Sequence, residues 1–231
     1  PKIGGIENLI ENLSIELSKT HEVLVLADQH DQKNDSDYDT KYDQNISISI
    51  SRISGIKFFR KRKKLKELKK LLSSKKISHV IADSWKSFEL TIDTLKSLSI
   101  PSICLAHGNE LIVKNSSKKL RVISILNKVT HIVTNSNFTL SLVKDIGITN
   151  KEITCIYPGA QNTIYLNEEI ISNINGKPVI TTLARLEKRK GHAFILSVIA
   201  KLKAEYPNIL YIIAGSGNEF ENLKKVTLEL D

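Results

Sequence analysis

The stretch "TTLARLEKRKGH" (181–192) places a dense group of cations directly after an apolar run. Arg185 ends the apolar run, and Lys190 lies at the mouth of the next predicted helix. Two cations that converge with a helix N-terminus form a receptor for a diphosphate, because the side chains and the free backbone N–H groups all donate to phosphate oxygens. Lys188 and Arg189 are expected to face solvent. An ordinary solvated loop is the alternative interpretation of the whole stretch.

Paired glycines occupy two further places that suit a phosphate. Gly4 and Gly5 precede the first predicted helix, and Gly215 and Gly217 follow a second apolar run in "IIAGSGNEF". Glycine lets the backbone approach a ligand closely, although a plain tight turn would use the same residues. The second pair is not a dinucleotide fingerprint, because Phe220 stands where the third glycine would be.

One histidine also ends a buried strand pattern. His107 closes the apolar run "PSICLA", and Gly108 after it frees space beside the ring. We therefore expect His107 to face a ligand. Glu110 lies nearby and could either orient His107 or cap the following helix.

These residues would be positioned by strands that alternate with helices. Alternation of this kind predicts βαβ units and parallel sheets, in which ligands lie at the carboxyl ends of the strands. The polar, acidic residues after the first strand are expected to form a mobile loop. Strands are predicted over residues 21–27, 46–51, 77–83, 101–107, 130–136 and 152–159, and helices over 5–19, 57–73, 85–98, 117–128 and 137–146.

The alternation stops at a polar stretch and then restarts. We expect residues 1–160 to form one Rossmann-like domain, 161–177 a linker, and 178–231 the start of a second α/β domain that is too short to be complete. The first residues run straight into a helix, and such a helix normally follows a strand. The sequence is therefore expected to be a fragment that lacks its first strand and most of the second domain.

Positive charge is concentrated in one segment. The chain has a net charge of +9, and residues 52–76 hold twelve Lys or Arg against one acid, Glu67. This imbalance favours a local basic surface and argues against a nucleic-acid-binding protein. The helix expected within the segment mixes apolar and cationic residues, which suits an anionic membrane surface, whereas a solvated helix packed on the sheet by its leucines is the alternative. The candidate docking residues are Phe59, Arg60, Lys61, Arg62, Lys63 and Lys64.

The remaining composition is that of a soluble globular protein. Hydrophobic residues make up 41% of the chain and charged residues 26%, and neither a membrane-spanning run nor a signal peptide is present. Cys104 and Cys155 lie in apolar runs and are expected to be reduced. A cytoplasmic location follows, peripheral on the inner face of the membrane if the basic segment docks there.

The ordered set of motifs resembles glycosyltransferase family 4. In this sequence the set consists of "RLEKRKGH" after a strand, "AGSG" after the next strand, "YPGA" at the domain junction, "SNFT" after "HIVTN", and "GGIE" at the start. The resemblance implies the GT-B architecture, in which two Rossmann-like domains face each other. It also implies retaining transfer of a sugar from a nucleotide-diphosphate sugar to a glycan or lipid-linked acceptor, without a cofactor or a required metal. "HGNE" is similar to members that mannosylate lipid-linked acceptors.

The resemblance also implies roles for the candidate residues. Arg185 and Lys190 would hold the donor diphosphate and stabilise the charge that develops as the sugar leaves. Gly4 and Gly5 would approach the same phosphates from the opposite domain, and His107 would contact the transferred sugar.

Two departures from the family pattern concern donor binding. Gly215 and Gly217 would let the nucleotide lie against the backbone. However, the sequence ends before the paired glutamates that bind the donor sugar and ribose in the family. Gln161 stands where the junction motif usually has Asp. We therefore expect the 231-residue chain alone to be inactive.

Other protein classes remain open at this point. A sugar-nucleotide epimerase or a phosphorylase would share the fold and the phosphate-binding cations, and a non-enzymatic basic membrane-binding module would need only residues 52–76. The acidic triplet at 35–37 resembles a metal-binding motif of another glycosyltransferase fold, but it lies in a predicted acidic loop away from the phosphate-binding residues.

Overall fold

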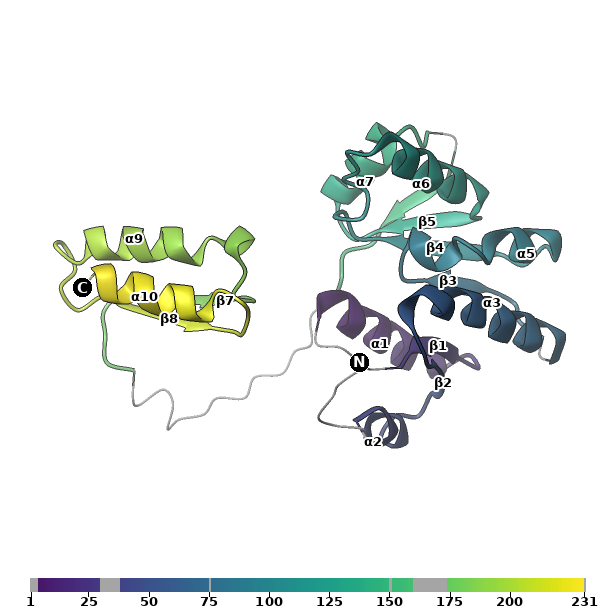
Figure 1. Cartoon of the computed structure of the whole chain (residues 1–231), viewed down its shortest axis with the longest axis horizontal. Coiled ribbons are helices and arrows are strands. Elements are labelled where there is room, and N and C mark those ends of the chain that lie inside the picture. The colour runs from purple at the N-terminus through teal and green to yellow at the C-terminus, as the bar shows by residue number, and fades with distance from the viewer. Residues whose placement is uncertain (1–3, 30–37, 75, 150, 160–173, 231) are drawn as a thin grey trace. The chain divides into compact units, whose positions relative to one another are not determined.

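The computed structural model describes residues 4–29, 38–74, 76–149, 151–159 and 174–230. The chain divides into two compact units, Pro1–Ala160 and Gln161–Asp231, called unit 1 and unit 2 below (Figure 1). Each unit is described by itself. The acidic triplet at 35–37, Gln161 and most of the expected linker lie outside the described residues.

The described residues of unit 1 form six strands in two parallel sheets. One sheet pairs β1 with β2, and the other has the order β3-β4-β5-β6. The parallel pairing and the α/β character agree with the sequence prediction. The strands are β1 (Leu24–Asp28), β2 (Ser49–Ile53), β3 (Val80–Ala82), β4 (Ser102–Ala106), β5 (His131–Thr134) and β6 (Ile153–Cys155), and the helices are α1 (Gly5–Ser18), α2 (Tyr38–Gln44), α3 (Lys57–Ser74), α4 (Trp85–Phe88), α5 (Ile92–Ser97), α6 (Ser116–Lys128) and α7 (Asn137–Asp145).

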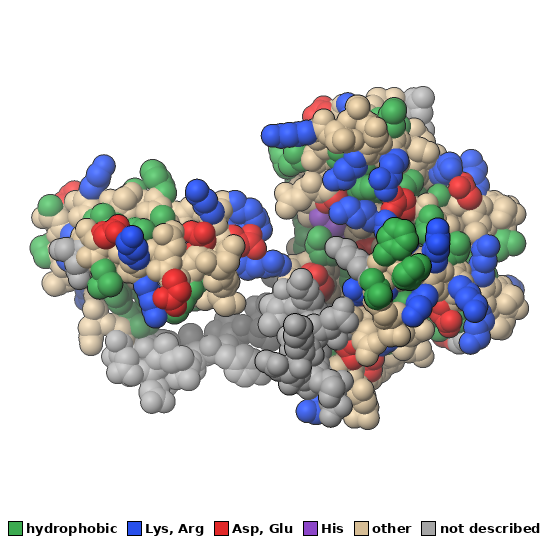
Figure 2. All heavy atoms as spheres, viewed as in Figure 1, with side chains coloured by type: hydrophobic (Ala, Val, Ile, Leu, Met, Phe, Trp, Pro, Cys, Tyr) green, Lys and Arg blue, Asp and Glu red, His purple; other side chains and the backbone are tan. Residues whose placement is uncertain are grey.

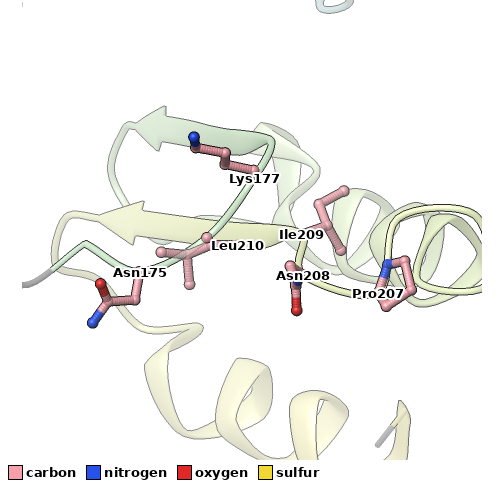
Figure 3. A pocket seen from close by; sticks show the side chains of 7 residues that line it. Asn175, Lys177, Pro207, Asn208, Ile209 and Leu210 are labelled. Carbon is pink, nitrogen blue, oxygen red and sulfur yellow. The ribbon is translucent and has the colours of Figure 1, made fainter.

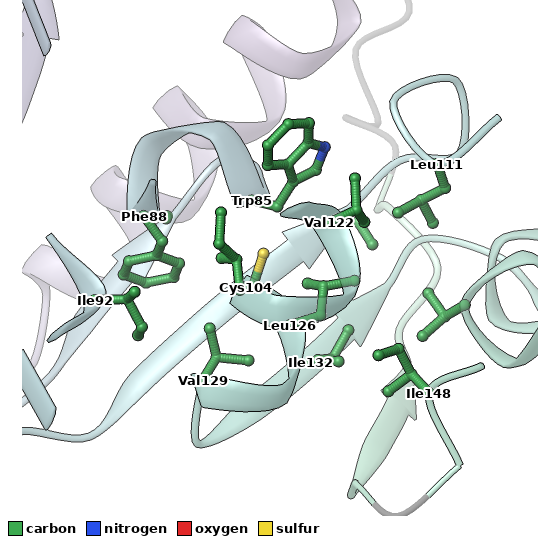
Figure 4. Packing of buried hydrophobic residues seen from close by; sticks show 14 of the residues in the cluster. Trp85, Phe88, Ile92, Cys104, Leu111, Val122, Leu126, Val129, Ile132 and Ile148 are labelled. Atoms are coloured by element: carbon green, nitrogen blue, oxygen red, sulfur yellow. The ribbon is translucent and has the colours of Figure 1, made fainter. Parts of the chain in front are cut away.

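A single apolar core holds unit 1 together. Figure 4 shows α4, α5 and α6 packing side chains such as Trp85, Phe88 and Leu126 over the four-stranded sheet. Leu68 of α3 belongs to the same cluster and Leu26 of β1 packs against it, so the two sheets share this core. Burial of this kind stabilises a domain by roughly 25 cal/mol per Å² of apolar surface.

Local structure departs from the prediction in three places. The helix expected over 85–98 is broken into α4 and α5, and the Thr91 hydroxyl between them donates to the Ser87 carbonyl at 3.1 Å. Part of the expected mobile loop is the helix α2, whose Asp43 binds Arg52 of β2. The strand β2 also begins three residues later than expected. The pairing of Asp43 with Arg52 joins α2 to β2, a contact that local patterns do not contain.

Unit 2 consists of two parallel strands and two helices within its described residues. The chain runs through β7 (Val179–Leu183), the 3₁₀ turn η1 (Lys188–Lys190), α9 (His192–Leu202), β8 (Leu210–Ala214) and α10 (Phe220–Leu230). The register pairs Val179 with Leu210 and Leu183 with Ala214, so both strands end at the same edge. Residues of β7 are alternately exposed and half-buried.

The loops after β7 and β8 touch through their backbones. A Cβ atom at Gly215 would collide with the Ala184 carbonyl, and one at Gly217 with the Leu186 carbonyl. The Leu186 N–H also donates to the Ser216 carbonyl at 2.9 Å. These two glycines therefore have a packing role that stands independently of any ligand.

The variant Gly217→Ala should destabilise unit 2, because its new methyl group has no space against the Leu186 carbonyl. Overpacking of this type typically costs about 1–3 kcal/mol. Hydrogen exchange of the β7 and β8 amides would report the loss as faster exchange. Gly5→Ala is the matched control, since a Cβ there meets nothing within 4 Å; equal protection in both variants would contradict the packing role.

Candidate functional site

The cations of unit 2 lie on residues 185–191, called the cation loop below. The loop starts two residues after β7 and ends at Gly191, which has φ 74° and serves as the N-cap of α9. That left-handed conformation suits glycine. Gly191 has no side chain that could cap α9, so the first N–H groups of this helix remain available to a ligand.

The backbone of Arg185 is fixed on both sides. Ala184 N–H donates to the Ala214 carbonyl at 3.1 Å, and Leu186 N–H donates to Ser216. Between them, the Arg185 carbonyl lies 3.0 Å from His192 Nε2. The start of the cation loop is thus held beside the loop that follows β8, which contains Gly215 and Gly217.

His192 is a residue that the sequence analysis missed. Its side chain is only 2% exposed, and in the described part of unit 2 the other buried side chains are Leu186 and Leu223. A carbonyl can only accept, so Nε2 carries the hydrogen; Nδ1 is buried without a hydrogen-bond partner. The motif "KGH" contained this signal, since a histidine at the first position of a predicted buried helix is placed to bond the preceding loop.

A carboxylate sits among the cations of the loop. Glu187 accepts from Arg185 Nη1 at 3.3 Å and from Arg189 Nε at 2.7 Å. The hydrogen bond from Arg189, together with the positive charges of both arginines, lowers the pKa of the Glu187 carboxyl. Arg189 was expected only to face solvent; it is exposed but paired. Lys190 is exposed and takes part in no ion pair among the described residues.

The arrangement is suited to binding an anion with several oxygens. Arg185 and Lys190 flank the cation loop, Gly191 leaves the α9 N-terminus uncapped, and Gly215 and Gly217 lie against the same loop. Guanidinium, ammonium and backbone N–H groups are the donors that phosphate prefers. The structure therefore brings together four of the predicted donor-binding residues at one edge of the β7–β8 pair.

The remaining predicted residues lie in unit 1. His107 follows β4, where its Nε2 lies 2.9 Å from the Asp83 carbonyl and its backbone N–H donates to Glu110 Oε1 at 2.7 Å. Glu110 therefore bonds the backbone of His107, which resolves the choice left open by the sequence. Gly108 has φ 109°, and a Cβ there would lie 3.3 Å from Thr139 Oγ1 of α7.

Gly4 and Gly5 open α1. Gly4 is the buried N-cap and has no side-chain cap, whereas the space around the Cα of Gly5 is open. These glycines and His107 belong to unit 1, and the cation loop belongs to unit 2.

The predicted membrane-docking residues on α3 differ in their contacts. Arg60 and Lys64 pair with Asp28 at 3.8 and 3.0 Å, and Lys61 pairs with Glu89. Two of the leucines of α3 pack inward: Leu68 is buried in the core and Leu72 packs against it. The alternative interpretation, a helix packed on the sheet by its leucines, is therefore confirmed for that face.

Exposed apolar side chains lie at the start of α3 and on the residue before it. Ile56, Phe58 and Phe59 are 73%, 74% and 49% exposed, and the two rings meet edge to face at 5.3 Å. Figure 2 shows hydrophobic side chains at this surface beside Lys and Arg side chains. Among the described residues, no helix combines the length and apolar character needed to cross a bilayer.

A cavity of about 570 Å³ in unit 2 lies away from the cation loop. It is lined by residues that precede β7 and β8, including Asn175, Lys177 and Asn208 (Figure 3). Parallel strands begin at one edge and end at the other, so this cavity is at the opposite end of β7 and β8 from Arg185. Within the described residues, no group of three His, Cys, Asp or Glu side chains could hold a metal ion.

Comparison with known structures identifies the architecture. The structure of Anabaena Alr3699/HepE in complex with UDP has 16% sequence identity and a TM-score of 0.74 over 99% of this chain. The lipopolysaccharide outer core galactosyltransferase WaaB has 16% identity and a TM-score of 0.63, again over 99% of the chain. Arabidopsis thaliana UGT89C1 complexed with UDP-L-rhamnose has 13% identity and a TM-score of 0.53 over 91%. The present chain spans 64%, 62% and 65% of these three proteins, respectively.

Comparison with family models agrees with the sequence motifs. A search of curated proteins returned no match. The model for Glycosyl transferases group 1 matches residues 167–231, and the model for Glycosyltransferase Family 4 matches residues 3–161. The α/β fold with parallel sheets is of the GT-B type, as expected, and the chain belongs to glycosyltransferase family 4.

Proposed function

We propose that the whole protein transfers a sugar from a nucleotide-diphosphate sugar to a glycan or lipid-linked acceptor, with retention of the anomeric configuration. The observation that carries the proposal is the cation loop, which presents Arg185 and Lys190 beside the uncapped N-terminus of α9. The UDP bound by HepE and the galactosyltransferase named WaaB support the same donor and acceptor classes.

Charge on the leaving diphosphate is the central problem of this reaction. The bond between the anomeric carbon and the diphosphate oxygen breaks, the acceptor hydroxyl oxygen bonds to that carbon on the same face, and the hydroxyl proton passes to the departing diphosphate. In the proposal, Arg185, Lys190 and the α9 N–H groups neutralise the departing diphosphate, in place of a divalent cation. Fixed donors of this kind lower the barrier because they need no reorganisation as the charge develops.

His107 is proposed to contact the transferred sugar. With its Nε2–H held by the Asp83 carbonyl, Nδ1 of the neutral ring remains a hydrogen-bond acceptor. A sugar hydroxyl is a donor of matching chemistry. Asp83 and Glu110 would then act as positioning residues, since they hold the ring and backbone of His107.

Replacing Arg185 or Lys190 by alanine in the full-length protein should lower turnover on the order of 100-fold or more, as the loss of a transition-state charge partner can. Lys188→Ala is the matched control and should be nearly silent. Steady-state kinetics with a UDP-sugar donor, with and without EDTA, would measure both effects. If all three variants behaved alike, the diphosphate assignment would be wrong; conversion of the free nucleotide sugar without an acceptor would instead indicate an epimerase.

The variant Gly5→Ala should separate stability from activity. Alanine in a helix is favoured over glycine by roughly 0.5–1 kcal/mol, and the open space at Gly5 accepts the methyl group. Thermal unfolding should therefore be unchanged or occur at a higher temperature. If Gly5 approaches the donor phosphates, turnover of the full-length protein should fall, whereas unchanged turnover would remove Gly5 from the donor site.

We also propose that α3 docks the protein on an anionic membrane. Ile56, which directly precedes α3, and Phe58 supply exposed apolar surface, and the exposed Arg62 lies one turn after Phe58. Each cation near such a surface is worth about 1 kcal/mol. A peripheral position on the inner face of the membrane would bring the enzyme to a lipid-linked acceptor.

Sedimentation with vesicles tests this docking. The double variant Ile56→Ser/Phe58→Ser should bind vesicles with anionic lipid more weakly than the native protein, and high salt should weaken both. The control Leu120→Ser/Phe138→Ser removes side chains that are 67% and 66% exposed elsewhere on unit 1 and should bind normally. Binding that ignored lipid charge, or that fell equally in both variants, would argue against docking through α3.

A further inference from the structure

A second basic feature of unit 1 is a groove between the end of β2 and α3. It has a volume of about 490 Å³, and its polar lining contains four cations and one carboxylate. The lining side chains with charge or hydroxyl groups are Arg52, Ser54, Lys63, Lys66, Glu67 and Lys70. The groove lies at the carboxyl end of a parallel strand, where ligands of α/β sheets are generally found.

The charge of Arg52 is already compensated by α2. Its Nε and Nη2 lie 3.0 and 2.5 Å from the carboxylate oxygens of Asp43, and Nη1 lies 3.3 Å from Asp39. Arg52 is therefore a fixed wall of the groove. It does not supply the free positive charge.

Lys63 is held at the rim of the groove. Its ammonium donates to the Ser54 carbonyl at 3.0 Å, and a Cβ at Gly55 would lie 2.9 Å from the same nitrogen. The absence of a side chain at Gly55 thus leaves the ammonium room to lie against the loop. Two of its three hydrogens remain to be donated.

Lys66 and Lys70 supply the uncompensated charge. Their spacing from Lys63 places all three on one face of α3, where neighbouring like charges repel. Neither takes part in an ion pair among the described residues, and Glu67 is the one carboxylate in the lining. An anion in the groove would relieve the repulsion and accept hydrogen bonds from several ammonium groups at once.

We propose that this groove binds a phosphate group, as a monoester or a diphosphate. Phosphate offers multiple oxygens and more than one negative charge, which matches three lysines that converge from one helix face. The proposal rests on residues of unit 1 alone and is independent of sugar transfer at the cation loop. The phosphate could belong to a lipid headgroup or to a soluble phosphate compound.

Two variants with equal loss of charge test the groove in the full chain. Lys66→Gln/Lys70→Gln removes the uncompensated cations of the lining, and Lys69→Gln/Lys119→Gln removes two exposed cations of unit 1 that lie outside the lining and outside the proposed docking residues. Calorimetric titration with inorganic pyrophosphate should show saturable binding. We expect that binding to weaken at least about tenfold in the groove variant and less than twofold in the control.

Vesicles of phosphatidylcholine with phosphatidic acid distinguish a lipid phosphate from a soluble phosphate compound as the ligand of the groove. If pyrophosphate displaces the protein from these vesicles, the groove accepts the phosphate irrespective of its carrier. Vesicle binding that pyrophosphate does not displace, but that the groove variant alone loses, assigns the groove to a lipid phosphate. Equal weakening of both variants toward both probes, or no saturable binding of either probe by the native chain, would overturn the proposal.

Discussion

The close backbone contact between the loops after β7 and β8 is the constraint on which unit 2 depends. It requires glycine at 215 and 217, because any Cβ there would meet a carbonyl of the neighbouring loop. The contact fixes Leu186, and with it the direction in which the chain leaves the sheet. His192 then closes the turn by bonding the Arg185 carbonyl, so the cations are positioned by buried groups that carry no charge of their own.

In unit 1, ion pairs orient the helix α3. Asp28 and Glu89 attract part of the dense cationic sequence of α3 inward, and the leucines of the helix bury themselves in the shared core. The helix therefore has an inner face that is satisfied by the fold and an outer face that is not. The exposed aromatic residues lie at the start of the helix, and the lysine groove faces the end of β2, where Lys66 and Lys70 take part in no ion pair among the described residues.

The fold was largely predictable from the sequence, and the candidate site only in part. Alternating strand and helix patterns identified the parallel strands, and the "RLEKRKGH" motif placed Arg185 and Lys190 at a strand end. The helix α2 was not predictable from local pattern, because its Asp43 is held by Arg52 of β2. The role of Asp83 was missed for the same reason, since its carbonyl meets His107 from a loop 24 positions away along the chain. The bonds of Glu187 and His192 are local to the cation loop, and the motif already contained both residues.

The pairing of Glu187 with Arg185 and Arg189 has a consequence for selectivity. A carboxylate attached to the same loop is present at a high effective concentration, so it behaves as a tethered competitor for any anion that approaches the arginines. A singly charged ion from solution offers little more than Glu187 already provides and gains little by displacing it. An anion with two phosphates can replace that carboxylate while also engaging Lys190 and the helix terminus, so the loop is biased toward polyvalent anions over the monovalent ions of the cell.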